Sequence, residues 1–167
     1  RLSQRLGQQF VVENKTGAGG SLGIAAMAKA APDGYTIGMV TAGTLFILPH
    51  IYKDKLGYDG RKDIRPIAMV GTQPNLLIVH SKIPANNVPE FLAYLKANAD
   101  KLSYGSSGIG TSQHLCMELI AQHTGTNPTH VPYRASNQII QDLLGGQIQM
   151  TCDQFSTAYP QVKAGNA

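Results

Sequence analysis

Segments with strand character alternate with segments of helical character along the chain. Strands are predicted at 10–13, 35–40, 67–70, 75–80, 102–104, 129–131 and 147–152, because these short runs are rich in apolar and β-branched residues. Helices are predicted at 1–8, 21–30, from Asn87, at 112–123, from 136 or 137, and at 156–163. This alternation favours an α/β fold with mainly parallel strand pairing. The 167 residues suffice for one ordinary domain or for parts of two small ones.

Two glycine-rich loops lead directly into apolar helical segments. One spans Tyr104–Ser112 and the other spans Gly17–Ser21. The start of a helix carries backbone N–H groups without intrahelical partners and the positive end of the helix dipole. Glycines and small hydroxyl residues let an anion approach that backbone closely. We therefore interpret the chain as a binder of small anions, with helix capping alone as the structural alternative.

Other small polar residues follow predicted strands. In open α/β sheets, ligands bind beyond the carboxyl ends of strands. Loops at 41–44, 105–112, 133–137 and 153–154 lie at such ends, and their candidate ligand-binding residues are Thr41, Gly43, Thr44, Ser106, Ser107, Thr111, Ser112 and Asp153. The alternatives are that Thr41 and Thr44 only finish a strand and that Asp153 caps the helix near Ser156.

Composition excludes several classes of partner. Charged residues make up 14% of the chain, against about 25% in typical globular domains. The net charge of +4 is spread along the sequence, and there is no Trp, so neither a compact basic patch nor a stacking platform for nucleic acid is expected. No run approaches the ~18 apolar residues that span a bilayer, so no membrane insertion is predicted.

Catalytic and metal-binding patterns are weak. The loop at 105–108 is not a G-x-S-x-G nucleophile elbow, and no H-E-x-x-H motif is present. The loop at 17–20 lacks the Lys-Ser or Lys-Thr ending of a phosphate-binding P-loop. With neither motif present, no cofactor and no metal are predicted. The alternative is an α/β enzyme that uses the Ser106–Thr111 loop as an oxyanion or phosphate cradle, with His114 as its base.

The two cysteines, Cys116 and Cys152, match no metal or redox spacing. Both lie among apolar residues, so we interpret them as two buried thiols. The alternative is one disulfide in an oxidising compartment.

Several ordered motifs resemble the Bug family of periplasmic receptors, which are the substrate-binding components of tripartite tricarboxylate transporters. The motifs lie at 12–20, 30–36, 102–115, 130–133 and 142–147 and cover almost the whole chain. The resemblance implies a two-lobed periplasmic binding protein fold of type II, the Venus-flytrap fold, truncated at both ends. The first lobe would span 1–101 and lack its first strand, and a partial second lobe would span 102–167.

The resemblance also implies a function without a reaction. A monomeric periplasmic receptor would close on a small carboxylate through backbone amides, hydroxyls and waters, and would deliver it to membrane transporter subunits. Ser107, Gly110, Thr111 and Ser112 would form a carboxylate loop, faced by Thr41 and Thr44 from the first lobe. A further helix start would add Ala135, Ser136 and Asn137, and Asp153 would contact the variable part of the ligand. A receptor-like sensor or chaperone partner with an occluded pocket is another alternative.

Overall fold

A four-stranded sheet organises the C-terminal part of the molecule. The computed structural model describes residues 2–167, apart from the side chain of Asp54. The strands are β1 (Asn75–Val79), β2 (Ser103–Ser106), β3 (Thr129–Pro132) and β4 (Met150–Gln154), in the order β1-β4-β2-β3. β2 runs parallel to both β3 and β4, whereas β1 runs antiparallel to β4. The predicted α/β class with mainly parallel pairing is thereby confirmed.

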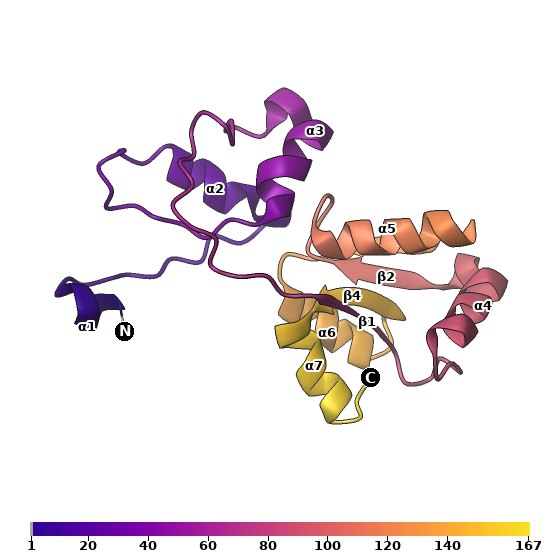
Figure 1. Cartoon of the computed structure of the whole chain (residues 1–167). Helices are drawn as coiled ribbons and strands as arrows, with labels where there is room; N and C mark the ends of the chain where they lie inside the picture. The colour runs from indigo at the N-terminus through magenta and orange to yellow at the C-terminus, as the bar shows by residue number, and fades with distance from the viewer. Residues whose placement is uncertain (1) are drawn as a thin grey trace.

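Helices cover both faces of this sheet (Figure 1). On one face lie α4 (Val88–Asn98) and α5 (Ser112–Thr124), and on the other lie α6 (Ser136–Leu144) and α7 (Phe155–Lys163). Each pair of helices buries its own apolar cluster against the strands. The first cluster contains Phe91, Leu95, Tyr104, Met117 and Met150, and the second contains Ile78, Ile139, Leu143, Ile148 and Ala158.

The N-terminal part, residues 2–74, has only short helices joined by long irregular segments (Figure 1). It contains α1 (Leu2–Leu6), the 3₁₀ turn η1 (Ala18–Gly20), α2 (Ser21–Ala28), the π-helical turn η2 (Gly43–Ile47), α3 (Leu48–Tyr52) and the 3₁₀ turn η3 (Lys53–Lys55). A last 3₁₀ turn, η4 (Ala99–Lys101), follows α4 in the sheet part, residues 75–167.

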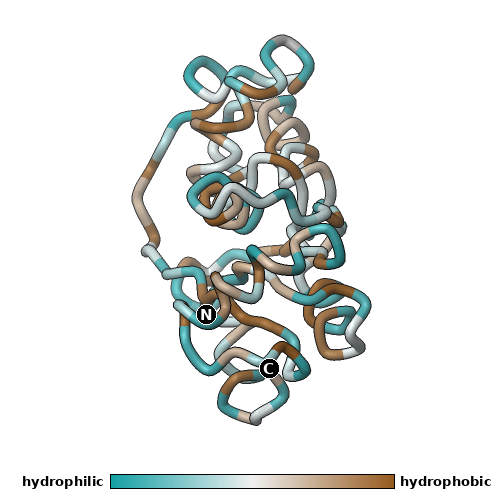
Figure 2. Tube along the Cα trace, turned by 90° about the vertical axis from the view of Figure 1, so that its right-hand side faces the viewer, coloured by the Kyte–Doolittle hydropathy of each residue, from teal (hydrophilic) through white to brown (hydrophobic). Residues whose placement is uncertain are grey.

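Three predicted strands in the N-terminal part are wrong. The segments 10–13, 35–40 and 67–70 have no strand structure. Val12, Met39 and Met69 are 82%, 84% and 83% exposed, and Figure 2 shows such apolar stretches on extended chain. A strand requires a neighbour that pairs with its backbone N–H and C=O groups. None of the described residues provides that neighbour, so an apolar pattern alone did not produce a sheet.

The packing changes near residue 74 and not at the predicted lobe boundary of residues 101 and 102. β1 pairs with β4 from Asn75–Gln154 to Val79–Met150, and Phe91 and Leu95 of α4 are buried in the first apolar cluster. Residues 75–101 therefore pack with the predicted second lobe, because their apolar side chains complete its core.

The cysteines form a disulfide, so the interpretation as two free thiols is wrong. Cys116 of α5 is bonded to Cys152 of β4, and the two Cα atoms are 6.2 Å apart. Cys152 is buried within the first apolar cluster, and Cys116 packs against it. Apolar surroundings suit either redox state, so local sequence could not decide between them.

None of the described helices combines the length and the apolar character required to cross a bilayer.

Candidate functional site

Three segments that are far apart in the sequence meet at one junction. They are the glycine loop at 17–20, the turn at 41–44 and the glycine loop at 107–111. A Cβ atom on Gly108 would lie 3.1 Å from the Gly19 nitrogen, and one on Gly43 would lie 3.1 Å from the Gly110 oxygen. The coil-to-helix junctions of α2 and α5 therefore face each other at contact distance.

Two glycines make this close approach possible. Gly108 and Gly110 have φ values of +125° and +80°, in the region that side chains with a Cβ atom rarely adopt. A Cβ atom on Gly110 would also lie 2.5 Å from Cδ2 of Leu48 in α3. The glycine-rich composition of this loop thus serves the contact between the two parts of the chain.

A second polar cluster lies at the carboxyl ends of β2 and β4. Gln113, in the first turn of α5, accepts hydrogen bonds from the Ser107 backbone N–H at 2.8 Å and from the Ser107 hydroxyl at 2.5 Å. Its amide nitrogen donates to Asp153 Oδ1 at 2.5 Å and to Ser136 Oγ at 3.3 Å. Three predicted site residues, Ser107, Ser136 and Asp153, are therefore joined by one residue that the sequence analysis did not select.

Several N–H groups of the carboxylate loop already have partners. The Gly108 N–H donates to Ser106 Oγ at 3.1 Å, and the Gly110 N–H donates to Nδ1 of His114 at 3.4 Å. By contrast, α6 begins after Ala135 without any side-chain cap. The first turn of α6 contains the half-buried Ser136 and the exposed Asn137, and its Gln138 N–H donates to the Ala135 carbonyl at 3.2 Å.

The two threonines of the first-lobe turn bond chiefly to each other. The Thr41 N–H donates to Thr44 Oγ1 at 3.1 Å, and the Thr44 hydroxyl donates to the Thr41 carbonyl at 2.8 Å. Thr44 is buried and Thr41 is exposed, while Gly43 touches the Gly110–Thr111 backbone. Thr111 caps α5 by accepting from the His114 N–H, and the neighbouring Ser112 is exposed.

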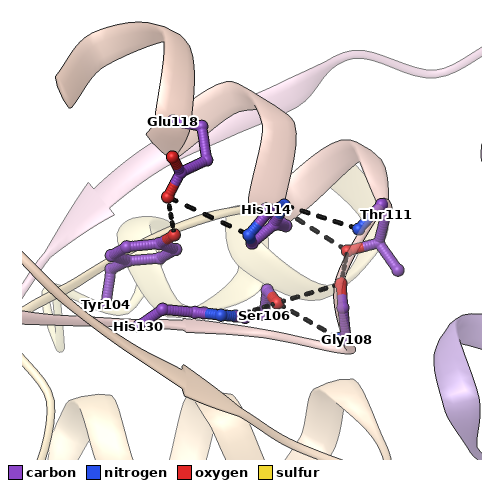
Figure 3. Close-up of polar contacts among 8 residues, drawn as sticks. Tyr104, Ser106, Gly108, Thr111, His114, Glu118 and His130 are labelled. Atoms are coloured by element: carbon purple, nitrogen blue, oxygen red, sulfur yellow. Dashed lines mark hydrogen bonds and ion pairs between the residues drawn. The ribbon is translucent and has the colours of Figure 1, made fainter. Parts of the chain in front are cut away.

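Ser106 belongs to a polar network that runs from the buried strand β2 to the exposed Glu118 of α5 (Figure 3). Its hydroxyl lies 2.7 Å from Nε2 of His130, whose ring stacks on Tyr104 at a centroid distance of 4.8 Å. The Tyr104 hydroxyl donates to Glu118 Oε1, which also lies 3.9 Å from Nε2 of His114. Burial, and then the bond to Glu118, raise the pKa of Tyr104. Ser106, Tyr104 and Glu118 thus fix the loop from below.

Ser106 and His130 have the spacing of a nucleophile and its base, but the serine is fully buried. Catalysis requires a substrate atom to reach the hydroxyl. The expected base was also His114, which instead accepts from the Gly110 N–H. The arrangement is therefore suited to holding the loop in place.

Two shallow pockets of the described residues lie elsewhere. One is lined by residues 96–101 and 125–127, and another by His80, Tyr94 and Gly146 with their neighbours. Neither contains a predicted ligand-binding residue.

A model of the tripartite tricarboxylate transporter family receptor, TctC, matches residues 1–167. The chain belongs to the TctC receptor family. A UPF0065 protein of Cupriavidus necator is 40% identical over 98% of this chain. The match covers 49% of that relative, so the TctC-family chain spans about half the length of the curated relatives that it matches.

Solved structures of similar proteins share the fold of this TctC-family chain. The periplasmic binding protein BugD is 38% identical with a TM-score of 0.92, over 99% of this chain and 55% of that one. A Rhodopseudomonas palustris protein solved with adipate is 33% identical with a TM-score of 0.93, over 99% and 55%. Another, MatC with bound malate, is 32% identical with a TM-score of 0.89, over 99% and 56%. The predicted family, the periplasmic binding protein fold and the periplasmic location are confirmed.

Gln113, His130, Tyr104 and Glu118 were missed in the sequence. Gln113 carried a usable signal, because a glutamine in the first turn after a glycine-rich loop can reach back to that loop's amides. The other three are separated by 12 to 26 residues and come together only when α5 and β3 pack beside β2. The identity of the ligand-binding residues of this TctC-family chain stays a prediction.

Removing His130 should change how stability depends on pH. Burial, and next the neighbouring His114, lower the pKa of His130 below its usual 6.5, with a smaller opposing effect from Glu118. The unfolded chain then takes up a proton near pH 6.5, whereas the folded chain does so only at lower pH. Stability is therefore lost as the pH falls below 6.5. Urea unfolding at pH 7 and pH 5 should show a smaller loss for His130→Gln than for the unsubstituted chain.

The exposed His123 near the end of α5 supplies the control, because His123→Gln removes a histidine that lies at the surface. An equal loss of stability in His130→Gln and His123→Gln between pH 7 and pH 5 would contradict the assignment.

Proposed function

We propose that the protein of which this chain is a part is a periplasmic receptor that binds a small carboxylate and delivers it to a tripartite tricarboxylate-type transporter. The observation that carries the proposal is the junction at which the glycine-rich helix starts of α2 and α5 meet across the two parts of the chain. Two similar proteins were solved with the dicarboxylates adipate and malate, which supports the proposed class of ligand.

The first turn of α6 is the proposed anchor for the carboxylate group. Its N–H groups lack a side-chain cap, and the half-buried Ser136 adds a hydroxyl. A helix start attracts a negative charge through these donors and through the positive end of its dipole. The amides of Gly108 and Gly110 contribute less, because Ser106 and His114 already accept from them.

Capture would proceed by closure of the two parts on each other. We propose that the junction of the loops at 17–20, 41–44 and 107–111 opens to admit the acid and closes over it. A ligand that binds the closed arrangement more tightly shifts the population toward it. The extended segment before β1, which includes the exposed Ile67 and Val70, is the proposed site of bending.

We propose no reaction for this site. In the one serine–histidine pair at hydrogen-bond distance among the described residues, Ser106 and His130, the serine hydroxyl is fully buried. The described residues also contain no group of three or more side chains able to hold a metal ion. We also propose that the receptor is a monomer and recognises transporter subunits; that it does not bind nucleic acid is supported by the dispersed positive charge of this chain.

A thermal-shift screen on the full-length protein tests the proposal. The library contains succinate, malate, adipate, glutamate, citrate and nicotinate, each paired with its uncharged amide. At least one acid should stabilise the protein, since a ligand at 100 times its Kd adds about 2.7 kcal/mol to the free energy of unfolding. The amides should have no effect. Failure of every acid, or equal stabilisation by the amides, would contradict the proposed function.

A further inference from the structure

Gln113 is a buried amide at the point where the ends of β2 and β4 meet the start of α6. It is 2% exposed. Its oxygen accepts two hydrogen bonds from Ser107, and its nitrogen donates to Asp153 and Ser136. One side chain therefore sets the relative position of the carboxylate loop, the α6 helix start and the end of β4.

The partners of Gln113 fix the orientation of its amide. The Ser107 backbone N–H can only donate, so the group that faces it must be the oxygen. A rotated amide would place its oxygen against Oδ1 of Asp153 and its NH₂ group against that N–H donor. The Gln113 nitrogen consequently faces Asp153 and donates a hydrogen bond to Oδ1 of its carboxylate.

Asp153 retains one oxygen without a donor. Oδ1 accepts from the Gln113 nitrogen at 2.5 Å and from the Gln154 backbone N–H at 2.7 Å. Oδ2 is buried, and none of the described residues donates to it. Burying a polar oxygen without a hydrogen bond is costly, so such groups in folded proteins normally have a partner. The missing donor must come from outside the described residues.

Asp153 is fully buried, so a ligand would reach its Oδ2 only once the site has opened, and Gln113 joins it to the proposed carboxylate anchor. The Gln113 nitrogen bonds both Asp153 Oδ1 and Ser136 Oγ, so the end of β4 and the first residue of α6 share a single partner. An acid held at the α6 start would thus bring its neighbouring substituent close to Asp153. A negative or purely apolar substituent would leave Oδ2 unsatisfied, whereas a hydroxyl or an ammonium group would satisfy it.

We propose that Gln113 is a positioning residue that holds Asp153 with Oδ2 free to accept from a hydroxyl or ammonium group on the bound acid. The protein therefore selects carboxylates that carry such a donor, for example 2-hydroxy or 2-amino acids, over the same acids without it. This inference rests on the proposed function and narrows its ligand class.

The selection is measured by calorimetry on the full-length protein with matched acids. The sets are succinate, malate and aspartate, and glutarate, 2-hydroxyglutarate and glutamate. In at least one set the hydroxy or amino acid should bind at least about tenfold more tightly than the unsubstituted acid, as expected for a hydrogen bond to a charged group. Asp153→Asn should reduce that preference to below about threefold, because its amide bonds a neutral donor less strongly.

The role of Gln113 is tested by exchanging the amide and the carboxylate. Gln113→Glu places a second carboxylate against Asp153 and should weaken binding of the preferred acid by about tenfold or more. The double variant Gln113→Glu with Asp153→Asn again pairs an acceptor with a donor. Its affinity should rise to about that of Asp153→Asn alone and no further, because the ligand donor still meets an amide oxygen and the Gln154 N–H loses its acceptor.

Gln122→Glu is the matched control. It makes the same change of charge on an exposed position of the same helix, and its affinity should stay within about twofold of the unsubstituted protein. Melting temperatures of all variants establish that each is folded. The double variant keeps the test decisive if Gln113→Glu alone fails to fold, since recovery of folding and binding together supports the pairing.

Several outcomes would overturn the inference. They are equal or tighter binding of succinate and glutarate, an unchanged preference in Asp153→Asn, or no difference between Gln113→Glu and Gln122→Glu. Failure of all six acids would also overturn it. In that case the wider acid screen still decides the proposed function separately, because adipate, citrate and nicotinate are outside these sets.

Discussion

Reduction of the Cys116–Cys152 disulfide is expected to lower the free energy of unfolding by about 3–4 kcal/mol, as estimated from loop-closure entropy. The bond closes a loop with a sequence separation of 36 residues, and without it the unfolded chain gains the conformational freedom of that loop. Urea unfolding with and without a reductant measures the difference.

The double variant Cys116→Ala with Cys152→Ala is the control for this prediction. It should unfold at the same urea concentration with and without the reductant, and close to the reduced form of the unsubstituted chain. An unfolding curve of the unsubstituted chain that does not move on reduction would contradict the stabilising role of the disulfide.

The disulfide also bears on the site. Cys116 lies one turn after Gln113 on α5, and Cys152 immediately precedes Asp153 on β4. The covalent bond therefore joins the two elements that carry the Gln113–Asp153 hydrogen bond. Reduction should loosen this pair in addition to destabilising the fold as a whole.

Gly110→Ala is expected to destabilise the junction between the two parts of the chain by about 2–5 kcal/mol. Its φ of +80° costs about 1–2 kcal/mol for a residue with a Cβ atom. Because that atom would lie 2.5 Å from Cδ2 of the buried Leu48, overpacking adds about 1–3 kcal/mol. Limited proteolysis should then cleave the exposed segment at 65–73 faster, and urea unfolding should begin at a lower concentration.

Gly125→Ala separates the two causes. Gly125 ends α5 with a φ of +68°, and a Cβ atom there would meet nothing within 4 Å. It should show only the backbone cost and no faster cleavage at 65–73. Equal behaviour of Gly110→Ala and Gly125→Ala would show that contact with Leu48 does not hold the junction together.

Much of the local structure could be predicted because it depends on neighbouring residues. Asn87 caps α4 by accepting from the Glu90 N–H at 3.0 Å, and its own side chain bonds the Glu90 carboxylate at 2.7 Å. The cap by Asn87 is what the spacing of Asn87, Pro89 and Glu90 predicts, whereas the Glu90 carboxylate accepts from the Asn86 backbone N–H at 2.8 Å and not from that of Asn87. Gly125 ends α5 in the left-handed conformation, as a glycine at that position indicates.

The candidate site could be predicted only in part. The glycine loops, Ser136 and Asp153 were selected because each follows a recognisable strand or opens a helix, and the structure joins Ser136 and Asp153 through Gln113. Ser106 was selected on the same grounds, yet its hydroxyl is directed to His130 and not to a ligand position. The spacing of 24 residues between them contains no information about which side of the strand the serine occupies, because that depends on how β2 and β3 pair.

The family, the α/β class and the local helix starts could be inferred from the residues alone, because caps, glycine turns and apolar periodicity act over a few residues. Which strands exist, where the packing changes, how the cysteines are paired and which loop amides remain available became known only from the folded arrangement. Each of these depends on partners that are distant in the sequence. The strand patterns at 10–13, 35–40 and 67–70 illustrate the reason: without a neighbouring strand to pair with, their apolar residues remain exposed.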